Sequence, residues 1–543
     1  MTRFLLALVL LGVGAALSLA HGRLAFMPLD QSIVFDGGWR LLSGQVPFRD
    51  FTTPAGLAPI LVQAAFFSTL GVDWLAYLLH AALVNGCFCL TVFALLREFG
   101  GSHPLSFFYA LLSGFLLYPP IGTPYLEPHA FFFLLLAGVL LAIACRSQRT
   151  GGRALLCLLV VVCWTASFAS KQNVAAFGVL LLASVLALRV RRWRELSAFA
   201  GWGAASLLLV ALGLVAVGRS LGVDAELFRT YFFELPYGSG QSRVANLPRV
   251  LAAAPLRTAT VSPVAVVGLM VGFGVAALLR RAFGHRASAR LRASLGTLWL
   301  ATSLVLTCVL ASATMFNATE IGFPYVVAAL GLAHLACASW LGERFGRSAA
   351  LSAGAAFAAI ASWDAGYFHT EVNAKRIVHD LVFDPRLASR PRTPELWGMV
   401  YQAPDRYGTT AKDLDDVLGF LRSRPENFVL IGDHSILYGL AGKPSVPPSL
   451  WFHKGLTLPE IHDAEHPRYL AAFDRNLDRY APRYLVLEGQ RTWMGSELRD
   501  FPRLRAAAAD PRNRRFSFGG FSVVDLGPAA ETRAPSTAPR PAR

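Results

Sequence analysis

The sequence predicts a mainly α-helical membrane protein, with about eleven transmembrane helices followed by a C-terminal α/β domain outside the cytoplasm. Apolar residues make up 54% of the 543 residues and gather in runs of roughly 17 to 24 residues, about the length of a helix that crosses a bilayer core. Arginines gather in the short segments between alternate runs, which is typical of cytoplasmic loops. From residue 365 onward, the apolar runs give way to shorter helix and strand patterns.

The apolar runs predict the crossings in chain order. The first run ends at Ser18-Leu19-Ala20, which resembles a signal-peptidase site, so cleavage of residues 1–20 stays an alternative. Residues 57–70 are too short to cross and are expected to lie along the outer face. A cytoplasmic N-terminus and about eleven crossings place the C-terminal domain outside the cytoplasm. The predicted crossings are residues 4–20, 74–96, 104–118, 126–145, 154–169, 174–188, 199–217, 261–279, 295–314, 321–341 and 349–363.

Loop arginines account for much of the net charge of +16. About sixteen arginines fall on the predicted inner side, against about nine basic residues in the longer outer loops. This asymmetry indicates membrane topology, whereas a nucleic-acid-binding protein carries its basic residues as a patch on one folded surface. We therefore expect membrane lipids, and no nucleic acid, among the partners.

The cysteines predict neither a disulfide framework nor a metal site. All seven lie within apolar runs, and no CxxC or Cys/His spacing occurs, so they are expected to pack as small apolar residues. A divalent metal would be compatible with the sequence, but no residue pattern supports one, and no cofactor is predicted. The cysteines are Cys87, Cys89, Cys145, Cys157, Cys163, Cys308 and Cys337.

Residues 364–526 alternate helix and strand patterns, which predicts a small α/β layer. Asp433-His434-Ser435 contains the residue types of a catalytic triad, but adjacent residues cannot converge as a nucleophile relay does. The Pro/Ala-rich tail, residues 527–543, has too little apolar surface to fold and is expected to be disordered. The predicted helices are 412–422, 458–479 and 497–508, and the predicted strands are 427–432, 483–488 and 516–526.

A polar segment, residues 28–56, separates the first two apolar runs. It must lie outside the hydrocarbon or line a cavity, because lipid cannot satisfy its backbone groups. Carboxylates so near a bilayer face indicate a functional site. The alternative is a solvated loop whose charged residues cap helices. The charged residues are Asp30, Arg40, Arg49, Asp50 and Asp36, the last of which we expect to face solvent.

Asp30-Gln31, followed by Leu42-x-Gly44-x-x-Pro47-Phe48-Arg49-Asp50-Phe51, resembles the bacterial GT-C glycosyltransferases. More narrowly, it resembles the protein mannosyltransferase/aminoarabinose-transferase-like group with the RgtA-type domain. The resemblance implies a GT-C-like transmembrane domain over residues 1–363, with a catalytic external loop at 21–56. Residues 431–444 also resemble the external domain of these enzymes.

The resemblance also implies site residues. Asp30 matches a catalytic acid in the first external loop of the family, and Glu127 in Leu126-Glu127-Pro128-His129 matches a second. Lys171 in Ser170-Lys171-Gln172-Asn173 matches a family lysine. Two features depart from the family pattern: Gln31 replaces a glutamate, and Thr53-Pro54-Ala55-Gly56 replaces a Lys-Pro-Pro segment that could hold phosphate.

The implied function is sugar transfer from a polyprenyl-phosphate donor to an acceptor hydroxyl of a glycan, lipid or protein. It would occur at the outer, periplasmic face of a bacterial inner membrane. Asp30 would be the general base, with Glu127 and Asp50 as further catalytic residues. Cationic and polar groups would bind the donor phosphate; the candidates are Lys171, Arg49, Arg243 and Gln172.

Simpler roles and other functions stay open. Lys171 could extend to the interface from a helix end, Glu127 could complement a helix dipole, and Arg49 could pair locally with Asp50. A non-catalytic transporter or lipid-handling protein is an alternative, as is an oligosaccharide polymerase or ligase. A transporter predicts a site at the centre of the membrane, whereas a glycosyltransferase predicts that Asp30, Glu127 and Lys171 converge outside it.

Overall fold

The computed structural model describes residues 2–24, 26–238, 289–314, 323–373, 384–402, 408–489, 492 and 495–527. The predicted crossing 261–279, Arg243 and the tail from 528 lie outside these residues. Contacts divide the chain into two compact units. We call residues 1–25, 55–223 and 240–384 the membrane unit, and residues 26–54, 224–239 and 385–543 the α/β unit. Each is described by itself.

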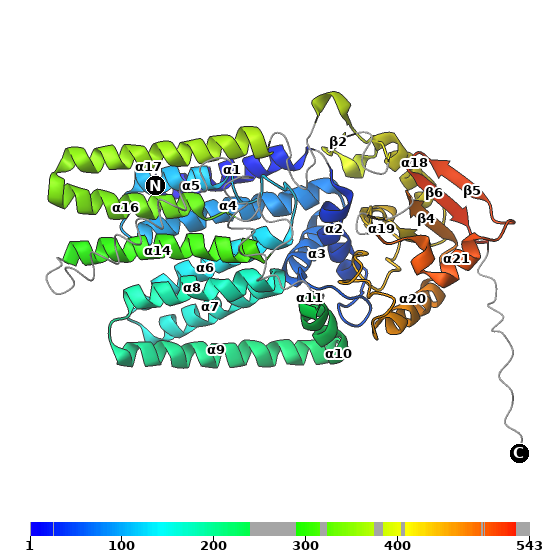
Figure 1. Ribbon diagram of the computed structural model, residues 1–543, viewed down its shortest axis with the longest axis horizontal. Helices are drawn as coiled ribbons and strands as arrows, with labels where there is room; N and C mark the ends of the chain where they lie inside the picture. The colour runs from blue at the N-terminus through cyan, green and yellow to red at the C-terminus, as the bar shows by residue number, and fades with distance from the viewer. Residues whose placement is uncertain are drawn as a thin grey trace, which may run out of the picture. The chain divides into compact units, whose positions relative to one another are not determined.

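Long helices form the membrane unit, and Figure 1 shows most of them running lengthwise beside one another. Close pairs form where side chains are small: a Cβ on Gly86 of α4 would lie 2.6 Å from the carbonyl oxygen of Leu11 in α1. The helices are α1 (Thr2–Gly22), α3 (Leu57–Leu70), α4 (Trp74–Glu98), α5 (His103–Ser113), α6 (Leu126–Arg146), α7 (Thr150–Ser170), α8 (Gln172–Arg189), α9 (Trp193–Ser220), α14 (Ala289–Ala313), α16 (Val326–Phe345) and α17 (Arg347–Tyr367), followed by a π-helix, η3 (Phe368–Asn373).

Eight helices within the described residues are long and apolar enough to cross a membrane. They are α1, α4, α6, α7, α8, α9, α14 and α16, and each coincides with a predicted crossing. The chain is therefore a multi-pass membrane protein. The alanine-rich α17 has 21 residues but falls outside this group.

The predicted crossing 104–118 is longer than the helix found there. The helix α5 has 11 residues and ends at Ser113, and residues 114–125 follow without regular helix although nearly all are buried. Pro119, Pro120 and Pro124 disfavour helix in this segment. Asn85 of α4 donates to the carbonyl oxygens of Gly14 and Gly114, at 2.7 and 3.0 Å, and so satisfies backbone groups that lipid could not.

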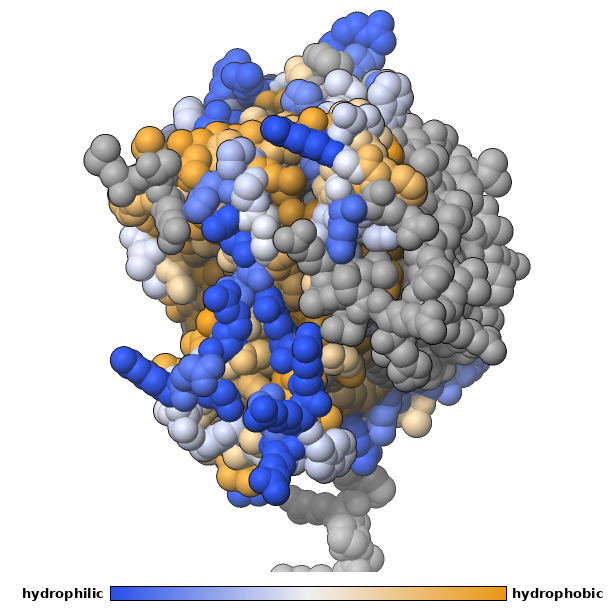
Figure 2. Space-filling view, turned by 90° about the vertical axis from the view of Figure 1, so that its left-hand side faces the viewer, coloured by the Kyte–Doolittle hydropathy of each residue, from blue (hydrophilic) through white to orange (hydrophobic). Residues whose placement is uncertain are grey.

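Figure 2 looks onto one end of the membrane unit, where hydrophilic side chains gather over the hydrophobic helices. Arg146 and Arg189, the last residues of α6 and α8, lie 2.9 and 3.7 Å from the carboxylate of Glu98. Two of the arginines that the sequence assigns to the inner side thus lie at helix C-termini and pair with the same glutamate. The orientation of the chain in the membrane stays a prediction.

The α/β unit contains a four-stranded sheet of order β3-β4-β6-β5 (Figure 1). The strands β3 (Phe428–Ile431) and β4 (Tyr484–Glu488) are parallel, with Phe428 opposite Tyr484. The strand β6 (Phe521–Asp525) is antiparallel to β4 and to β5 (Arg515–Phe518). The single strand predicted over 516–526 was wrong, because Gly519, with a φ of 56°, turns the chain between β5 and β6.

The helices of this unit confirm one prediction closely and correct two. The helix α18 (Ala411–Arg422) begins at a capping box in which Thr410 and Asp413 bond reciprocally. The helix α20 (His466–Tyr480) begins later than predicted, with Pro467 in its first turn. The predicted helix 497–508 is a 3₁₀ turn, η6 (Leu498–Asp500), and then α21 (Pro502–Ala508). The short elements are α10 (Ala225–Arg229), η1 (Thr230–Glu234), α11 (Leu235–Gly238), η4 (Pro385–Leu387), β1 (Ala388–Ser389), η5 (Pro394–Leu396) and β2 (Tyr401–Gln402).

Most of the polar segment after the first crossing, up to residue 54, folds within the α/β unit. Its helix, α2 (Pro28–Leu42), packs against α19 (Ile436–Ala441). A Cβ on Gly439 would lie 3.0 Å from Phe35 and 3.1 Å from Trp39, so the two helices meet closely there. Trp39 also donates from Nε1 to the carbonyl oxygen of Lys443 at 2.8 Å.

Candidate functional site

Three helices of the membrane unit begin at one place. The residue before α3 is Gly56, whose N–H lies 3.1 Å from the carbonyl oxygens of both Ala169 and Ser170, at the end of α7. A Cβ on Gly56 would lie 2.4 Å from Leu126, the first residue of α6. Lys171 alone separates α7 from α8. The N-termini of α3, α6 and α8 therefore lie together.

Glu127 and Lys171 form an ion pair at this junction. Lys171 Nζ lies 2.8 Å from Glu127 Oε1, and the Glu127 side chain is 9% exposed. The second carboxylate oxygen, Oε2, is buried and has no hydrogen-bond partner within the described part of the chain. Gln172 is buried beside Lys171 as the first residue of α8. The structure thus brings together three of the predicted site residues.

The electrostatics of this junction favour an anion. A helix N-terminus carries roughly half a positive elementary charge on its unsatisfied N–H groups, and three such termini meet here beside a lysine. Glu127 and the C-terminal carbonyl groups of α7 oppose them at the junction, and the positive groups outnumber these. The arrangement can hold a phosphate next to an acid.

Asn173, which the sequence did not single out, fixes the turn between α7 and α8. Its Nδ2 donates to the carbonyl oxygen of Ala311 at 3.1 Å and to Thr314 Oγ1 at 2.7 Å, at the end of α14. Gly56 was noted only as a departure from the family motif. The junction requires a glycine at this position for two reasons. Its φ of 89° is a conformation that L side chains rarely adopt, and an added Cβ would collide with Leu126.

Asp30 lies in the first turn of α2, in the α/β unit, and is half-buried. The neighbouring Gln31 accepts a hydrogen bond from the Met27 N–H at 2.9 Å, and so caps the helix from within. The contact gives Gln31 a structural role at the start of α2, a role that a glutamate oxygen would fill equally well.

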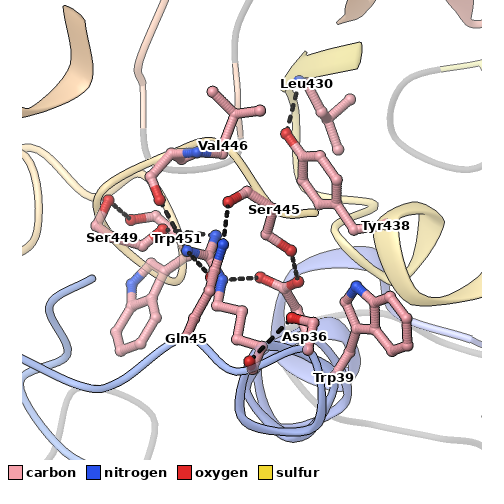
Figure 3. A network of polar contacts seen from close by, with 12 residues as sticks. Asp36, Trp39, Gln45, Leu430, Tyr438, Ser445, Val446, Ser449 and Trp451 are labelled. Atoms are coloured by element: carbon pink, nitrogen blue, oxygen red, sulfur yellow. Dashed lines mark hydrogen bonds and ion pairs between the residues drawn. The ribbon is translucent and has the colours of Figure 1, made fainter. Parts of the chain in front are cut away.

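Asp36 was expected to face solvent, and this was wrong. It is fully buried and accepts hydrogen bonds from Arg40 Nε at 2.8 Å and Ser445 Oγ at 2.5 Å (Figure 3). Arg40, only 1% exposed, also donates to the carbonyl oxygens of Pro447 and Ser449. Burial raises the pKa of Asp36, against the opposing effects of Arg40 and Ser445. The network joins α2 to a loop some 400 residues later in the sequence.

Asp50 is held by three donors. Arg49 Nη2 lies 2.7 Å from Oδ2, which also accepts from the Val46 N–H, and Arg479 Nη1 lies 2.9 Å from Oδ1. Burial would raise the pKa of Asp50, but the hydrogen bonds from Arg49, Val46 and Arg479 outweigh burial and lower it. The local pairing of Arg49 with Asp50 is therefore observed.

His434 forms a hydrogen-bonded group with Glu488 and Tyr401, which come from other segments of the chain, and this group differs from the triad-like Asp433-His434-Ser435. Its Nδ1 lies 2.5 Å from Glu488 Oε1, and its Nε2 lies 2.7 Å from the hydroxyl of Tyr401. All three side chains are buried; His434 follows β3, Glu488 is the last residue of β4, and Tyr401 belongs to β2. Within the described residues, no group of three or more His, Cys, Asp and Glu side chains could hold a metal ion.

No protein-family model and no curated protein matches the sequence. Among solved structures, the chain is similar to ArnT from Cupriavidus metallidurans bound to undecaprenyl phosphate. The TM-score is 0.55 and the identity 13%, over 97% of this chain and 98% of that chain. The chain has a GT-C fold.

Two further GT-C structures match less well. The apo form of the same ArnT gives a TM-score of 0.46 at 10% identity, over 97% of this chain and 99% of that chain. The archaeal oligosaccharyltransferase AglB from Archaeoglobus fulgidus, in complex with an inhibitory peptide and a dolichol-phosphate, gives 0.45 at 11% identity, over 89% and 69%. The GT-C fold rests on the first comparison, and it confirms the fold class predicted from the motif at residues 30–51.

Proposed function

We propose that this protein is a membrane glycosyltransferase. It transfers a sugar from a polyprenyl-phosphate donor to an acceptor hydroxyl at the outer face of a bacterial inner membrane. The observation that carries the proposal is the Glu127–Lys171 pair at the junction of three helix N-termini in a GT-C fold. The undecaprenyl phosphate in the similar ArnT structure supports the choice of lipid.

The residues divide the chemistry between them. Lys171 and the three helix N-termini bind the donor phosphate and stabilise the charge that develops on it as the bond to the sugar breaks. Glu127 holds Lys171 Nζ in place through Oε1, and its buried Oε2 has no other partner within the described residues. Asp30 accepts the proton of the acceptor hydroxyl as the new glycosidic bond forms, and this proton passes on to the released lipid phosphate.

Replacing Lys171 tests the proposal. Lys171→Met keeps the apolar stem and removes the charge, so affinity for undecaprenyl phosphate or turnover of its sugar should fall roughly tenfold or more, about 1.4 kcal/mol. Binding is measured on the purified protein in nanodiscs, and transfer with a panel of radiolabelled polyprenyl-phosphate sugars. Arg146→Met is the matched control, because Arg146 is paired with Glu98 at 2.9 Å, at the other end of α6.

The outcomes separate the alternatives. Loss of binding in Lys171→Met, with Arg146→Met unchanged, supports the site. Binding that depends on Lys171 without any sugar transfer would favour the non-catalytic lipid-handling protein. Equal binding by both variants and the parent would remove the phosphate site from the proposal.

A further inference from the structure

Four buried polar side chains of the membrane unit form a continuous hydrogen-bonded array, which we call the histidine array. Gln63 Oε1 lies 2.8 Å from His80 Nδ1, and His80 Nε2 lies 2.7 Å from His129 Nε2. His129 Nδ1 in turn contacts the hydroxyl of Tyr118. Each of the four residues has an exposed fraction of 0%. The array therefore lies wholly inside a helical unit that is otherwise mainly apolar.

Burying such an array is costly wherever one of its polar groups lacks a hydrogen-bond partner. A buried polar group that loses its partner costs about 1–3 kcal/mol, and four apolar residues would fill the same space without that risk. The rings also pack specifically: Phe66 stacks on His80 with centroids 5.1 Å apart, and the two histidine rings meet edge to face at 4.7 Å. The array is thus ordered, and its one atom without a hydrogen-bond partner within the described residues is Gln63 Nε2 at its far end.

The array ends at the start of α6. His129 lies two residues after Glu127, and its Nδ1 is 2.9 Å from the carbonyl oxygen of Tyr125, the residue that precedes the helix. Gln63 belongs to α3, so the array connects two of the three helices that begin at the candidate site. His80, on α4, is the link between them.

The hydrogen bonds of the array can run in either of two directions, and the direction decides whether His129 can donate to the residue that precedes α6. With the Gln63 oxygen facing His80, the ring N–H groups point toward Gln63, and His129 Nδ1 accepts from Tyr118. The Tyr125 carbonyl then receives no hydrogen from this ring. Turning the Gln63 amide reverses every donor, and His129 Nδ1 can then donate to the Tyr125 oxygen 2.9 Å away. The proton arrangement of the array is thus linked to the residue that precedes α6.

We infer that the histidine array fixes the start of α6, so that Gln63, His80, His129 and Tyr118 are positioning residues for the Glu127–Lys171 pair. The phosphate-binding role of that pair rests on the proposed function, whereas its placement by the array does not. None of the four side chains needs to touch the donor. They act by keeping Glu127 where its carboxylate can hold Lys171.

Hydrogen–deuterium exchange in nanodiscs tests the placement without any ligand. Tyr118→Phe removes one hydroxyl from the array, and His80→Phe interrupts its middle. Amides at the start of α6 should exchange roughly tenfold faster in both variants. Tyr109→Phe is the control, because it also removes a tyrosine hydroxyl bonded to a histidine, His334, at 2.9 Å, but outside the array. Tyr118→Phe keeps the test available if His80→Phe does not fold.

A second readout follows the histidines themselves. In protein with ¹⁵N-labelled histidine, undecaprenyl phosphate should shift the paired Nε2 resonances of the parent but not those of Lys171→Met. Unchanged exchange at the start of α6 in both array variants would overturn the inference. Faster exchange in the array variants, with lipid binding independent of Lys171, would uphold the inference and reject the proposed function.

Discussion

At the residue scale, the carboxylates of the polar segment lie close together in the sequence but have different environments. Asp36 and Arg40 are fully buried and bonded to a loop at Ser445–Ser449, whereas Asp30 is half-buried at a helix start. The sequence identified Asp30 through a family motif. It could not identify the burial of Asp36, because the bonding partners of Asp36 and Arg40 include residues some 400 positions away.

Two matched substitutions separate a structural acid from a catalytic one. Asp36→Asn leaves the Arg40 guanidinium buried without a countercharge, which costs about 3–5 kcal/mol, so the protein should melt at a lower temperature or express poorly. Asp30→Asn should retain the melting temperature and lose roughly 10²-fold in transfer activity, since it removes the proposed base. Thermal unfolding and transfer rates of the two variants are the measurements. An Asp30→Asn enzyme with full activity would contradict the assignment of the base.

At the element scale, the candidate site depends on where helices begin. The apolar runs located the described helices well, because length and composition suffice for a crossing. The sequence also placed Glu127 and Lys171 at helix ends. It could not show that α3 begins beside them, because that depends on the contact between Gly56 and Leu126. The β5–β6 hairpin was missed for a similar local reason, a two-residue turn at Gly519-Gly520 inside one apolar pattern.

Gly56 gives a sharp test of this junction. Gly56→Ala adds a Cβ at 2.4 Å from Leu126 at a φ of 89°, so α3 or α6 must shift. Gly44→Ala is the control, because Gly44 has a φ of 85° and no atom within 4 Å of the added Cβ. Both variants pay about 1–2 kcal/mol of backbone strain. Undecaprenyl phosphate affinity should fall at least fivefold in Gly56→Ala alone. An equal fall in both would show that general destabilisation, and not the junction, is responsible.

At the scale of the whole molecule, the two units are interleaved in sequence. The α/β unit takes residues 26–54 from between two membrane segments and joins them to the C-terminal region. The family resemblance grouped these residues with the transmembrane domain as its external loop, and no pattern in the sequence linked them to the C-terminal region. Contacts such as Trp39 with Lys443 and Arg40 with Pro447 reveal the connection.

The interleaving predicts that the C-terminal region is incomplete alone. Residues 385–527 expressed by themselves lack α2, which leaves the Gly439 face of α19 and the Ser445–Ser449 loop without partners. Their melting temperature should lie at least about 10 °C below that of a fragment that also carries residues 26–54 through a linker, since several kcal/mol of contacts are lost. Circular dichroism on both fragments measures this. Equal melting temperatures would show that α2 contributes little to the stability of the domain.

The most direct test of the proposed function is a cryo-electron microscopy structure of the purified protein with undecaprenyl phosphate. We predict that the phosphate lies within hydrogen-bond distance, about 2.7–3.2 Å, of Lys171 Nζ, at the starts of α3, α6 and α8. A phosphate bound elsewhere, with the Glu127–Lys171 pair unchanged and unoccupied, would contradict the proposal.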